Sequence, residues 1–314
     1  MFINNNIIKM INEYVKKLID NLPDNIQNTK QPIVLDLVLD GGAFNGSYMV
    51  GALYFLKEME NRKYIKIRRI SGCSIGSFIA FMYFINQLDM IETFCEMGMK
   101  EYKENHTLSI VRNIKSHIIS IIPDDICSKI NNKLYISYYN IKNQHKVVKS
   151  VYKSVDHLLN IIIKSCFIPY IIDGNMMYKN KYIDGLTPYM FKVEQGVNIL
   201  HLDLLGIDKI GNIFNIKNEK TPTHRVLSGL LDIHNFYIKQ CNTQMCSYVN
   251  DWSIMNKLIY NCKIVLEKII IIIIYNFIKL EKWAKPYIHN TLIYKITIQI
   301  IKDVLLILFQ QYCV

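Results

Sequence analysis

The sequence lacks the patterns that most often hold a metal ion or cross-link a chain. None of its eight cysteines belongs to a C-x-x-C pair, and its eight histidines show no H-E-x-x-H spacing. These absences exclude the common zinc frameworks and a disulfide scaffold, and they favour reduced thiols inside a cell. We therefore expect neither a metal nor a cofactor.

The hydropathy pattern also predicts neither a membrane-crossing helix nor a secretory leader. No apolar run reaches the roughly 18–20 residues that span a bilayer. The closest, 269–278, is flanked by charged residues. The N-terminus has no basic segment followed by an unbroken apolar stretch. We expect an intracellular, cytoplasmic protein whose contact with membranes is peripheral.

Charge is sparse but strongly of one sign. Charged residues make up 20% of the 314 residues and hydrophobic ones 51%, which excludes a disordered chain and allows a large core. The net charge of +11 favours an anionic membrane surface or nucleic acid as partner, and the alternative is a solvated lysine-rich surface. The wealth of Ile, Asn, Lys and Tyr indicates an AT-rich genome, compatible with a large DNA virus or a cellular parasite.

The first part of the chain alternates strand-like and helical segments. Residues 33–39 form a nearly continuous apolar run, which is typical of a strand buried in a parallel sheet. A glycine-rich segment, 40–46, and a helical pattern over 47–60 follow. A second strand then leads into a serine turn and another helix. This βαβα order predicts an α/β fold with a mostly parallel central sheet.

The remaining segments predict additions to that core. Residues 1–22 have the spacing of an amphipathic helix, and 134–152 reads as a hairpin. A second hairpin is expected to turn at Asp173-Gly174, and the chain is expected to be helical from residue 225 to its end. For the last amphipathic helix, 293–308, we favour a core-facing position over an interfacial one.

A possible nucleophile lies at the start of the second helix of the βαβα unit. Gly72-Cys73-Ser74-Ile75-Gly76 has the form G-x-S-x-G, between a strand and a helix. Such a corner exposes a serine hydroxyl at a helix N-terminus. On its own the pattern is weak, because Gly and Ser are common.

Acyl transfer needs oxyanion donors and a base besides the nucleophile. The small residues of Asp40-Gly41-Gly42-Ala43-Phe44-Asn45-Gly46 can present backbone N–H groups, and their glycine spacing does not fit the dinucleotide pattern G-x-G-x-x-G. The base is open from the residues alone. Four histidines follow Asp184, but none lies in a loop with an obvious signature: His201, His224, His234 and His289.

Three blocks together resemble the patatin-like phospholipase family. They are the glycine loop from Asp40 with its helix, the serine turn at 72–77, and the stretch from Ser165 through Asp173-Gly174 to Asp184-Gly185. The resemblance covers roughly residues 33–205 and implies a three-layer α/β/α core with a helical C-terminal extension. Four regions follow: 1–30 (helix and connector), 31–205 (catalytic domain), 206–225 (loop) and 226–314 (helical region).

The resemblance also implies roles for single residues. Ser74 would be the nucleophile of a Ser–Asp dyad and Asp184 its general base, chosen over Asp173 because Asp173 fits the preceding turn. The oxyanion hole would be formed by the N–H groups of Gly41, Gly42 and Ala43. Gly46, Gly72, Gly76 and Gly185 would support the motifs. The implied activity is that of a serine hydrolase of the phospholipase A type, cleaving ester bonds of phospholipids or related lipids.

Three positions depart from the family pattern: Ala43 replaces a glycine, Asn45 replaces a basic residue, and Leu186 stands where Gly or Ala is commoner. The oxyanion hole can still form with alanine at position 43 if φ of Ala43 is negative. One alternative is therefore a patatin-fold protein that binds membranes with impaired activity. Another is a soluble esterase with a Ser-His-Asp triad. Nucleic-acid binding is the least favoured, because the basic cluster at 62–69 has no recognition motif beside it.

Overall fold

A computed structural model describes residues 2–206 and 209–288 and five single positions further on (296, 299, 300, 304 and 307). Within them, a seven-stranded sheet has the order β4-β3-β2-β1-β6-β7, and β5 pairs with β3 off this path. The strands are β1 (Ile33–Leu39), β2 (Ile65–Cys73), β3 (Leu134–Asn140), β4 (His145–Lys149), β5 (Tyr182–Ile183), β6 (Asn198–Leu202) and β7 (Cys246–Tyr248).

The centre of the sheet is parallel and its margins are antiparallel. β1 pairs in parallel with β2 and β6, and β2 pairs in parallel with β3. The remaining pairs are antiparallel: β4 and β5 each pair with β3, and β7 pairs with β6. This confirms the expected α/β fold with a mostly parallel centre. Because the carboxyl ends of β1, β2, β3 and β6 meet at one edge, the loops that follow them gather there.

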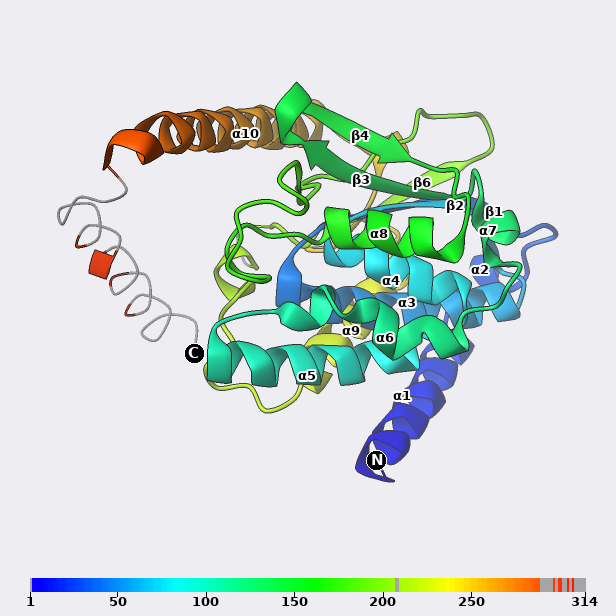
Figure 1. Ribbon diagram of the computed structural model, residues 1–314. Helices are drawn as coiled ribbons and strands as arrows, with labels where there is room; N and C mark the ends of the chain where they lie inside the picture. Colours follow the sequence, from blue (N-terminus) through cyan, green and yellow to red (C-terminus); the bar gives the residue numbers. More distant parts are fainter. Residues whose placement is uncertain are drawn as a thin grey trace.

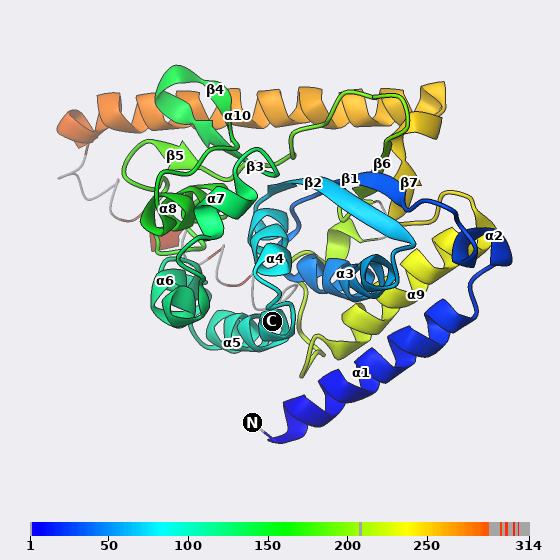
Figure 2. The ribbon, with the colours of Figure 1, turned by 90° about the vertical axis from the view of Figure 1, so that its right-hand side faces the viewer.

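Helices cover both faces of this sheet (Figures 1 and 2). α3, α4 and α8 lie against one face, α9 and α1 pack outside α3, and α10 crosses the opposite face. The longer helices are α1 (Phe2–Asp20), α3 (Gly46–Asn61), α4 (Ile75–Phe84), α5 (Asp89–Asn105), α8 (Val155–Ser165), α9 (Thr223–Lys239) and α10 (Ile254–Ile288). Three short ones are α2 (Asp24–Gln27), α6 (Ile114–Ile118) and α7 (Ile126–Ile130).

The side chains of β1 show why this strand has no polar face. Leu35, Leu37 and Leu39 are buried in the main core with α3 and α4, whereas Val38 packs with Phe191 on the other face. A strand covered on both sides loses the alternation of a half-exposed strand and reads as a continuous apolar run. The three-layer arrangement is thus already implicit in residues 33–39.

The segment before Asp184 corrects one expectation. Asp173 and Gly174 do form a turn, with φ of 74° at Gly174, but no strands flank it. Tyr182–Ile183 pairs instead with β3, at Tyr139 and Asn140. The expected second hairpin is therefore wrong, because the edge of β3 beyond the end of β2 takes up this strand.

The C-terminal region also differs from the all-helical expectation. β7 (Cys246–Tyr248) lies between α9 and α10 and extends the sheet beside β6. The amphipathic helix expected at 293–308 falls largely outside the described residues. Its four described apolar positions are exposed: Ile296, Ile300, Val304 and Ile307. Among the helices described, none combines the length and hydropathy that crossing a bilayer requires.

The N-terminal helix has the amphipathic character that its sequence predicts. Ile11, Val15 and Ile19 of α1 are buried in the main core, whereas the lysines of α1 point outward. The 134–152 hairpin is also confirmed, since β3 and β4 pair with Asn140 opposite His145.

Candidate active site

Ser74 stands at the corner between β2 and α4. Its backbone has φ 51° and ψ −134°, a combination that side-chain-bearing residues rarely adopt. α4 begins at the next residue, so the positive end of its dipole lies at Ser74. The Ser74 carbonyl accepts bonds from Ser77 Oγ at 2.7 Å and Cys166 Sγ at 3.0 Å, and its N–H donates to Ser165 Oγ at 2.9 Å.

The glycines of the corner allow backbones to approach each other closely. A Cβ on Gly72 would lie 2.6 Å from the carbonyl oxygen of Gly76. A Cβ on Gly76 would lie 2.6 Å from the carbonyl oxygen of Asp40, and one on Gly46 would lie 2.5 Å from the Ile75 side chain. Since real Cβ atoms do not come this close, each glycine lets α3, α4 and the strand ends pack together.

The hydroxyl of Ser74 is bonded to Asp184. Ser74 Oγ donates to Asp184 Oδ2 at 2.5 Å, and both residues are 5% exposed. The N–H of Leu186 donates to the second carboxylate oxygen at 2.9 Å, which fixes its orientation. A Cβ on Gly185 would lie 2.2 Å from the Ser137 carbonyl oxygen, so this loop lies flat on β3. The two predicted residues are brought together from positions far apart in the sequence.

The environment of Asp184 makes its carboxylate more basic. Burial raises the pKa of the Asp184 carboxyl to about 6, the bond from Ser74 opposes this rise, and the negative charge of Glu267 adds to it. A carboxylate with a pKa near neutrality accepts a proton more readily than an ordinary Asp and is still ionised at pH 7.

A second group of polar side chains holds the loop that follows Asp184. Glu267 of α10 is 3% exposed and accepts a hydrogen bond from Thr187 Oγ1. Lys146 of β4 donates to Thr187 Oγ1 at 2.5 Å and lies 3.2 Å from Glu267 Oε1. Sequence reasoning missed all three residues. The one available clue was that Glu267 is the only acid in the apolar and lysine-containing stretch 263–280.

The glycine loop after β1 lies directly against Ser74. A Cβ on Gly41 would be 2.9 Å from the Ser74 Cβ. Gly42 has φ 156° and Ala43 φ 43°, so the negative φ on which the sequence argument relied is not found at Ala43. Within the described part of the chain, the N–H groups of Gly41, Gly42 and Ala43 donate to no protein acceptor, so they are available to a ligand.

Asn45 is buried, and its side chain is hydrogen-bonded to a charged residue of α9. Arg225, which is 1% exposed, donates from Nη1 to Asn45 Oδ1 at 2.8 Å. Asn45 Nδ2 donates to the carbonyl oxygens of Leu204 and Lys209 at 3.2 and 2.9 Å. Glu219 accepts three hydrogen bonds from the Arg225 guanidinium, two from Nε at 3.1 and 3.0 Å and one from Nη2 at 2.6 Å. The glycine loop therefore has a cation beside it, supplied by α9 rather than by residue 45.

An apolar pocket opens beside Ser74. The empty space of the pocket, including its mouth that is open to solvent, is about 710 Å³. The walls come from the glycine loop, α4, α5, residues 108–114 and the segment after α8. They are almost entirely hydrocarbon and sulfur: Ala43, Phe44, Ile75, Phe78, Ile91, Phe94, Cys95, Gly98, Leu108, Ile110, Val111, Ile114, Cys166, Ile168 and Ile172. Such a lining suits an alkyl chain rather than a polar ligand.

The other candidate bases are engaged elsewhere. His201 Nε2 lies 3.0 Å from Asp40 Oδ1 in the buried layer under α10, and His224 Nε2 lies 3.5 Å from Glu219. His234 packs edge-on against Phe55, and His289 lies outside the described residues. Over the part of the chain that is described, the Ser74 hydroxyl bonds to Asp184 and to no histidine.

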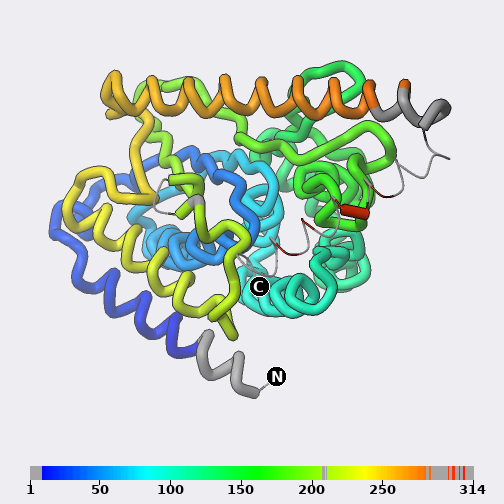
Figure 3. Tube along the Cα trace, turned by 90° about the vertical axis from the view of Figure 1, so that its left-hand side faces the viewer, coloured from blue at the N-terminus to red at the C-terminus, as the bar shows by residue number. Residues whose placement is uncertain are grey.

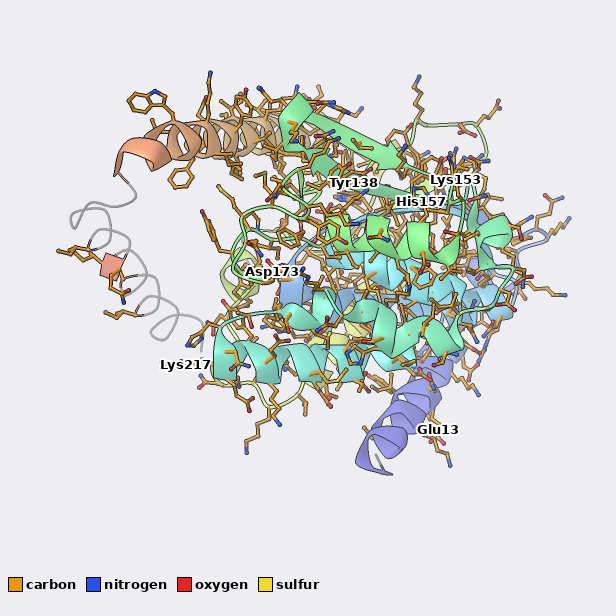
Figure 4. The ribbon with its side chains drawn as sticks, in the orientation of Figure 1. Glu13, Tyr138, Lys153, His157, Asp173 and Lys217 are labelled. Atoms are coloured by element: carbon orange, nitrogen blue, oxygen red, sulfur yellow. The ribbon has the colours of Figure 1, made fainter. Side chains whose placement is uncertain are left out.

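Asp173, the other Asp-Gly aspartate, does not reach the serine. Asp173 is labelled in Figure 4, and its carboxylate accepts a hydrogen bond of 2.5 Å from Arg112 Nη1. Among the described side chains, no group of three or more His, Cys, Asp or Glu residues could hold a metal ion.

The sheet, the serine corner and the glycine loop form an α/β/α arrangement consistent with the fold of patatin-like proteins. The family model described as Patatin-like phospholipase matches residues 37–145, which include the glycine loop and Ser74. The resemblance found in the motifs is thereby confirmed. Asp184 lies beyond the matched range, so its place beside Ser74 is an independent observation of the structure.

Curated relatives cover the same region. Omega-hydroxyceramide transacylase of Mus musculus is 24% identical over 136 residues, which are 41% of this chain and 23% of that protein. The Homo sapiens transacylase is also 24% identical, with 26% of it covered, and mouse 1-acylglycerol-3-phosphate O-acyltransferase Pnpla3 is 26% identical over 165 residues, 37% of its length. The chain thus spans about a quarter to a third of these relatives.

Proposed function

We propose that the protein is a lipid acyl hydrolase in which Ser74 and Asp184 act as a catalytic dyad. The observation that carries the proposal is the 2.5 Å bond between Ser74 Oγ and Asp184 Oδ2 at the mouth of an apolar pocket. The family match, and the lipid substrates in the relatives' names, support an activity on lipid acyl groups.

The first half of the reaction forms an acyl-enzyme. Ser74 Oγ attacks the ester carbonyl carbon while its proton passes to Asp184 Oδ2. The negative charge on the carbonyl oxygen is stabilised by N–H groups of Gly41, Gly42 and Ala43. When the tetrahedral intermediate collapses, the bond to the alcohol oxygen breaks, and Asp184 returns the proton to that oxygen. The lipid alcohol leaves, and the acyl group stays on Ser74.

The second half repeats these steps with a hydroxyl acceptor. Asp184, again a carboxylate, takes a proton from water as the water oxygen attacks the acyl carbon. The Ser74 oxygen leaves with that proton, and a fatty acid is released. A lipid alcohol in place of water would give an acyl transfer by the same steps, as the names of the relatives indicate for those proteins. The product, a free fatty acid or a new ester, distinguishes the two.

The pocket beside Ser74 supports a long acyl chain as the group transferred. Its lining is nearly free of polar atoms, so burying methylenes there stabilises the complex by about 0.8 kcal/mol each. Short acyl chains leave much of this lining in contact with water. KM is therefore expected to fall, and kcat/KM to rise, as the acyl chain becomes longer.

The test uses purified wild type, Ser74→Ala and Asp184→Asn with phospholipid vesicles, and it measures released fatty acid. We expect Ser74→Ala to reduce the rate to background and Asp184→Asn to reduce it by about 10²–10⁴-fold. Asp173→Asn is the matched control, because it makes the same change at the other Asp-Gly pair. The dyad is wrong if either dyad variant keeps wild-type turnover.

The two alternatives give other outcomes in the same experiment. Failure of a fluorophosphonate to label Ser74 in the wild type would favour a patatin-fold protein without activity. Loss of activity in a His201, His224, His234 or His289 variant, with Asp184→Asn still active, would favour a histidine triad.

A further inference from the structure

α10 exposes most of its surface to solvent although it lies on the core. It crosses the sheet face opposite α3 and α4, from the β7 side to the β4 side (Figure 2). Nine of its described side chains are partly or fully buried: Asn256, Tyr260, Lys263, Ile264, Glu267, Ile271, Ile274, Tyr275 and Ile278. At about 100° per residue these positions cover roughly a third of the circumference, so they occupy one side of the helix.

The outward side of α10 is apolar. Thirteen large hydrophobic residues on this helix are exposed, with fractions from 43% at Ile270 to 87% at Ile254. They are Ile254, Met255, Leu258, Ile259, Val265, Leu266, Ile269, Ile270, Ile272, Ile273, Phe277, Leu280 and Trp283. A contiguous apolar surface of this size is unusual on a soluble face and marks a contact surface.

The exposed charged side chains described on α10 are three lysines in one row, whereas Lys263 is half-buried and pairs with Asp203. Lys257, Lys268 and Lys279 are all exposed and recur every eleven residues. Eleven residues complete three turns with a remainder of about 20°, so the three ammonium groups follow one line along the helix. At about 100° per residue, that line falls between the buried positions and the exposed apolar arc. Among the described side chains of α10, the one carboxylate is Glu267, which points inward.

The helix lies along the edge of the molecule that contains the site. In Figure 1 the arrowhead of β3 points to the left-hand side, and Figure 3 shows that side with α10 along one margin. Ser74 directly follows the parallel strand β2, so it lies at the same edge of the sheet. In Figure 1 the second half of α10 extends past the ends of the strands. A surface bound to α10 therefore lies next to the strand ends.

We propose that α10 docks the protein on an anionic lipid bilayer. The apolar arc enters the boundary between head groups and acyl chains, and the lysine row lies at the level of the phosphates. A helix of 35 residues is about 52 Å long, so it offers a flat surface a long line of contact. This docking requires no catalysis and stands apart from the dyad.

Charge decides between a bilayer and a second copy of the chain. Antiparallel pairing of two α10 helices about a twofold axis would bring lysine rows of the same sign to the same interface, and none of the α10 carboxylates whose side chains are described is exposed to compensate them. The net charge of +11 adds repulsion between copies. An anionic bilayer complements both the apolar arc and the lysines.

The test measures flotation of the full chain with vesicles, in a Ser74→Ala background so that binding is independent of turnover. Vesicles contain phosphatidylcholine alone or with 30% phosphatidylglycerol. We expect binding to the anionic vesicles, weakened at least about tenfold by Lys257→Gln/Lys268→Gln/Lys279→Gln. Leu266→Asn/Ile273→Asn/Leu280→Asn should abolish it. Equal binding by both α10 variants and by Ser74→Ala overturns the proposal.

The controls remove the same groups from other surfaces. Lys9→Gln/Lys16→Gln/Lys17→Gln takes three exposed lysines from α1, and Val151→Asn/Val193→Asn takes exposed apolar residues from loops. Both should bind nearly as well as the Ser74→Ala parent. Circular dichroism of each variant checks that the fold is kept.

A depth measurement separates α10 from the rest of the chain. Trp252→Phe leaves Trp283, on the outward side of α10, as the single tryptophan. Its fluorescence should be quenched by vesicles with brominated acyl chains. Absence of quenching while the protein is bound rules out insertion by this helix. Self-association in sedimentation velocity that the apolar variant removes, without vesicle binding, would instead assign the surface to a second copy and overturn the proposal.

Discussion

At the corner of the glycine loop, Ala43 adopts φ 43°, where an L-residue with a Cβ is strained by about 1–2 kcal/mol. A glycine in the family pattern has no such strain. Ala43 keeps its backbone N–H, so the strain lowers the stability of the fold and does not remove this hydrogen-bond donor. It also explains why sequence reasoning failed at this position, because the backbone there follows the neighbouring loop and not the residue.

Ala43→Gly should therefore stabilise the protein by about 1 kcal/mol, since the strain exceeds the greater entropy of glycine in the unfolded chain. Urea unfolding measures the change. Ala52→Gly is the matched control in the middle of α3, where the same substitution should destabilise by about 1 kcal/mol or more through helix propensity and lost packing. A loss of stability in Ala43→Gly would contradict the positive φ.

In the proposed dyad, the carboxyl of Asp184 is expected to set the acidic limit of activity. The working form is the carboxylate, and its pKa is about 6, so the rate should fall as pH drops through 6. Glu267→Gln removes a negative charge that raises this pKa, so the acid limb should move to lower pH. The pH dependence of kcat/KM on a soluble ester measures both effects.

Glu92→Gln is the control for that shift. Burial raises the pKa of Glu92 to about 7, but its carboxyl is on α5 and is not among the groups acting on Asp184. Its neutralisation should leave the acid limb in place. An unchanged limb in Glu267→Gln as well would show that α10 does not influence Asp184.

Among the elements, those defined by local pattern were predictable. The run 33–39, the glycine loop and the serine turn each carry their information within a few residues, so the βαβα order and the position of Ser74 followed from the sequence. The β3–β4 hairpin was predictable for the same reason. β7 has three residues, which is too short for a period of two to be visible.

The contacts that complete the site could not be predicted in this way. Glu267 meets Thr187 across 80 residues, and Arg225 meets Asn45 across 180. Such pairs leave no spacing in the sequence, because they depend on how α9 and α10 pack. Asp184 was found only through the family resemblance, since the residues alone left the base open.

The hydrogen bond between Arg225 of α9 and Asn45 of the glycine loop leads to a further prediction. Asn45→Ala removes the acceptor of Arg225 Nη1 and two amide bonds to the 204–209 segment, which costs about 1.5–3 kcal/mol where the partner is charged. Because the glycine loop is proposed to stabilise the oxyanion, kcat should fall about tenfold or more while KM changes little. Steady-state kinetics on vesicles measure the two separately.

Asn212→Ala is the matched control, since Arg225 bonds only the backbone carbonyl of Asn212. Its kinetics should match the wild type. A rise of KM with unchanged kcat in Asn45→Ala would mean that the α9 tie serves binding rather than the transition state.

At the scale of the whole molecule, the positive charge is not distributed as the sequence suggested. Arg68 and Arg69, the end of the basic cluster, both bond Asp36, which is buried, and Glu194. Arg62 pairs with Asp20 and Glu58. The cluster that had suggested nucleic acid is thus largely neutralised, because β1 and β2 in register bring a carboxylate beside it.

The net positive charge of the chain should act at long range on its binding to anionic vesicles. A net charge of +11 steers the protein toward a negative surface over about one Debye length, roughly 10 Å at 0.1 M salt and 3 Å at 1 M. The insertion of the apolar arc of α10 is short-range and little screened. Raising salt from 0.1 to 1 M should therefore slow association by tenfold or more and leave dissociation nearly unchanged. Stopped-flow fluorescence of Trp283 in the Trp252→Phe variant measures both rates. A dissociation rate that rises with salt as steeply as association falls would show that charge alone holds the protein on the bilayer, and that α10 does not insert.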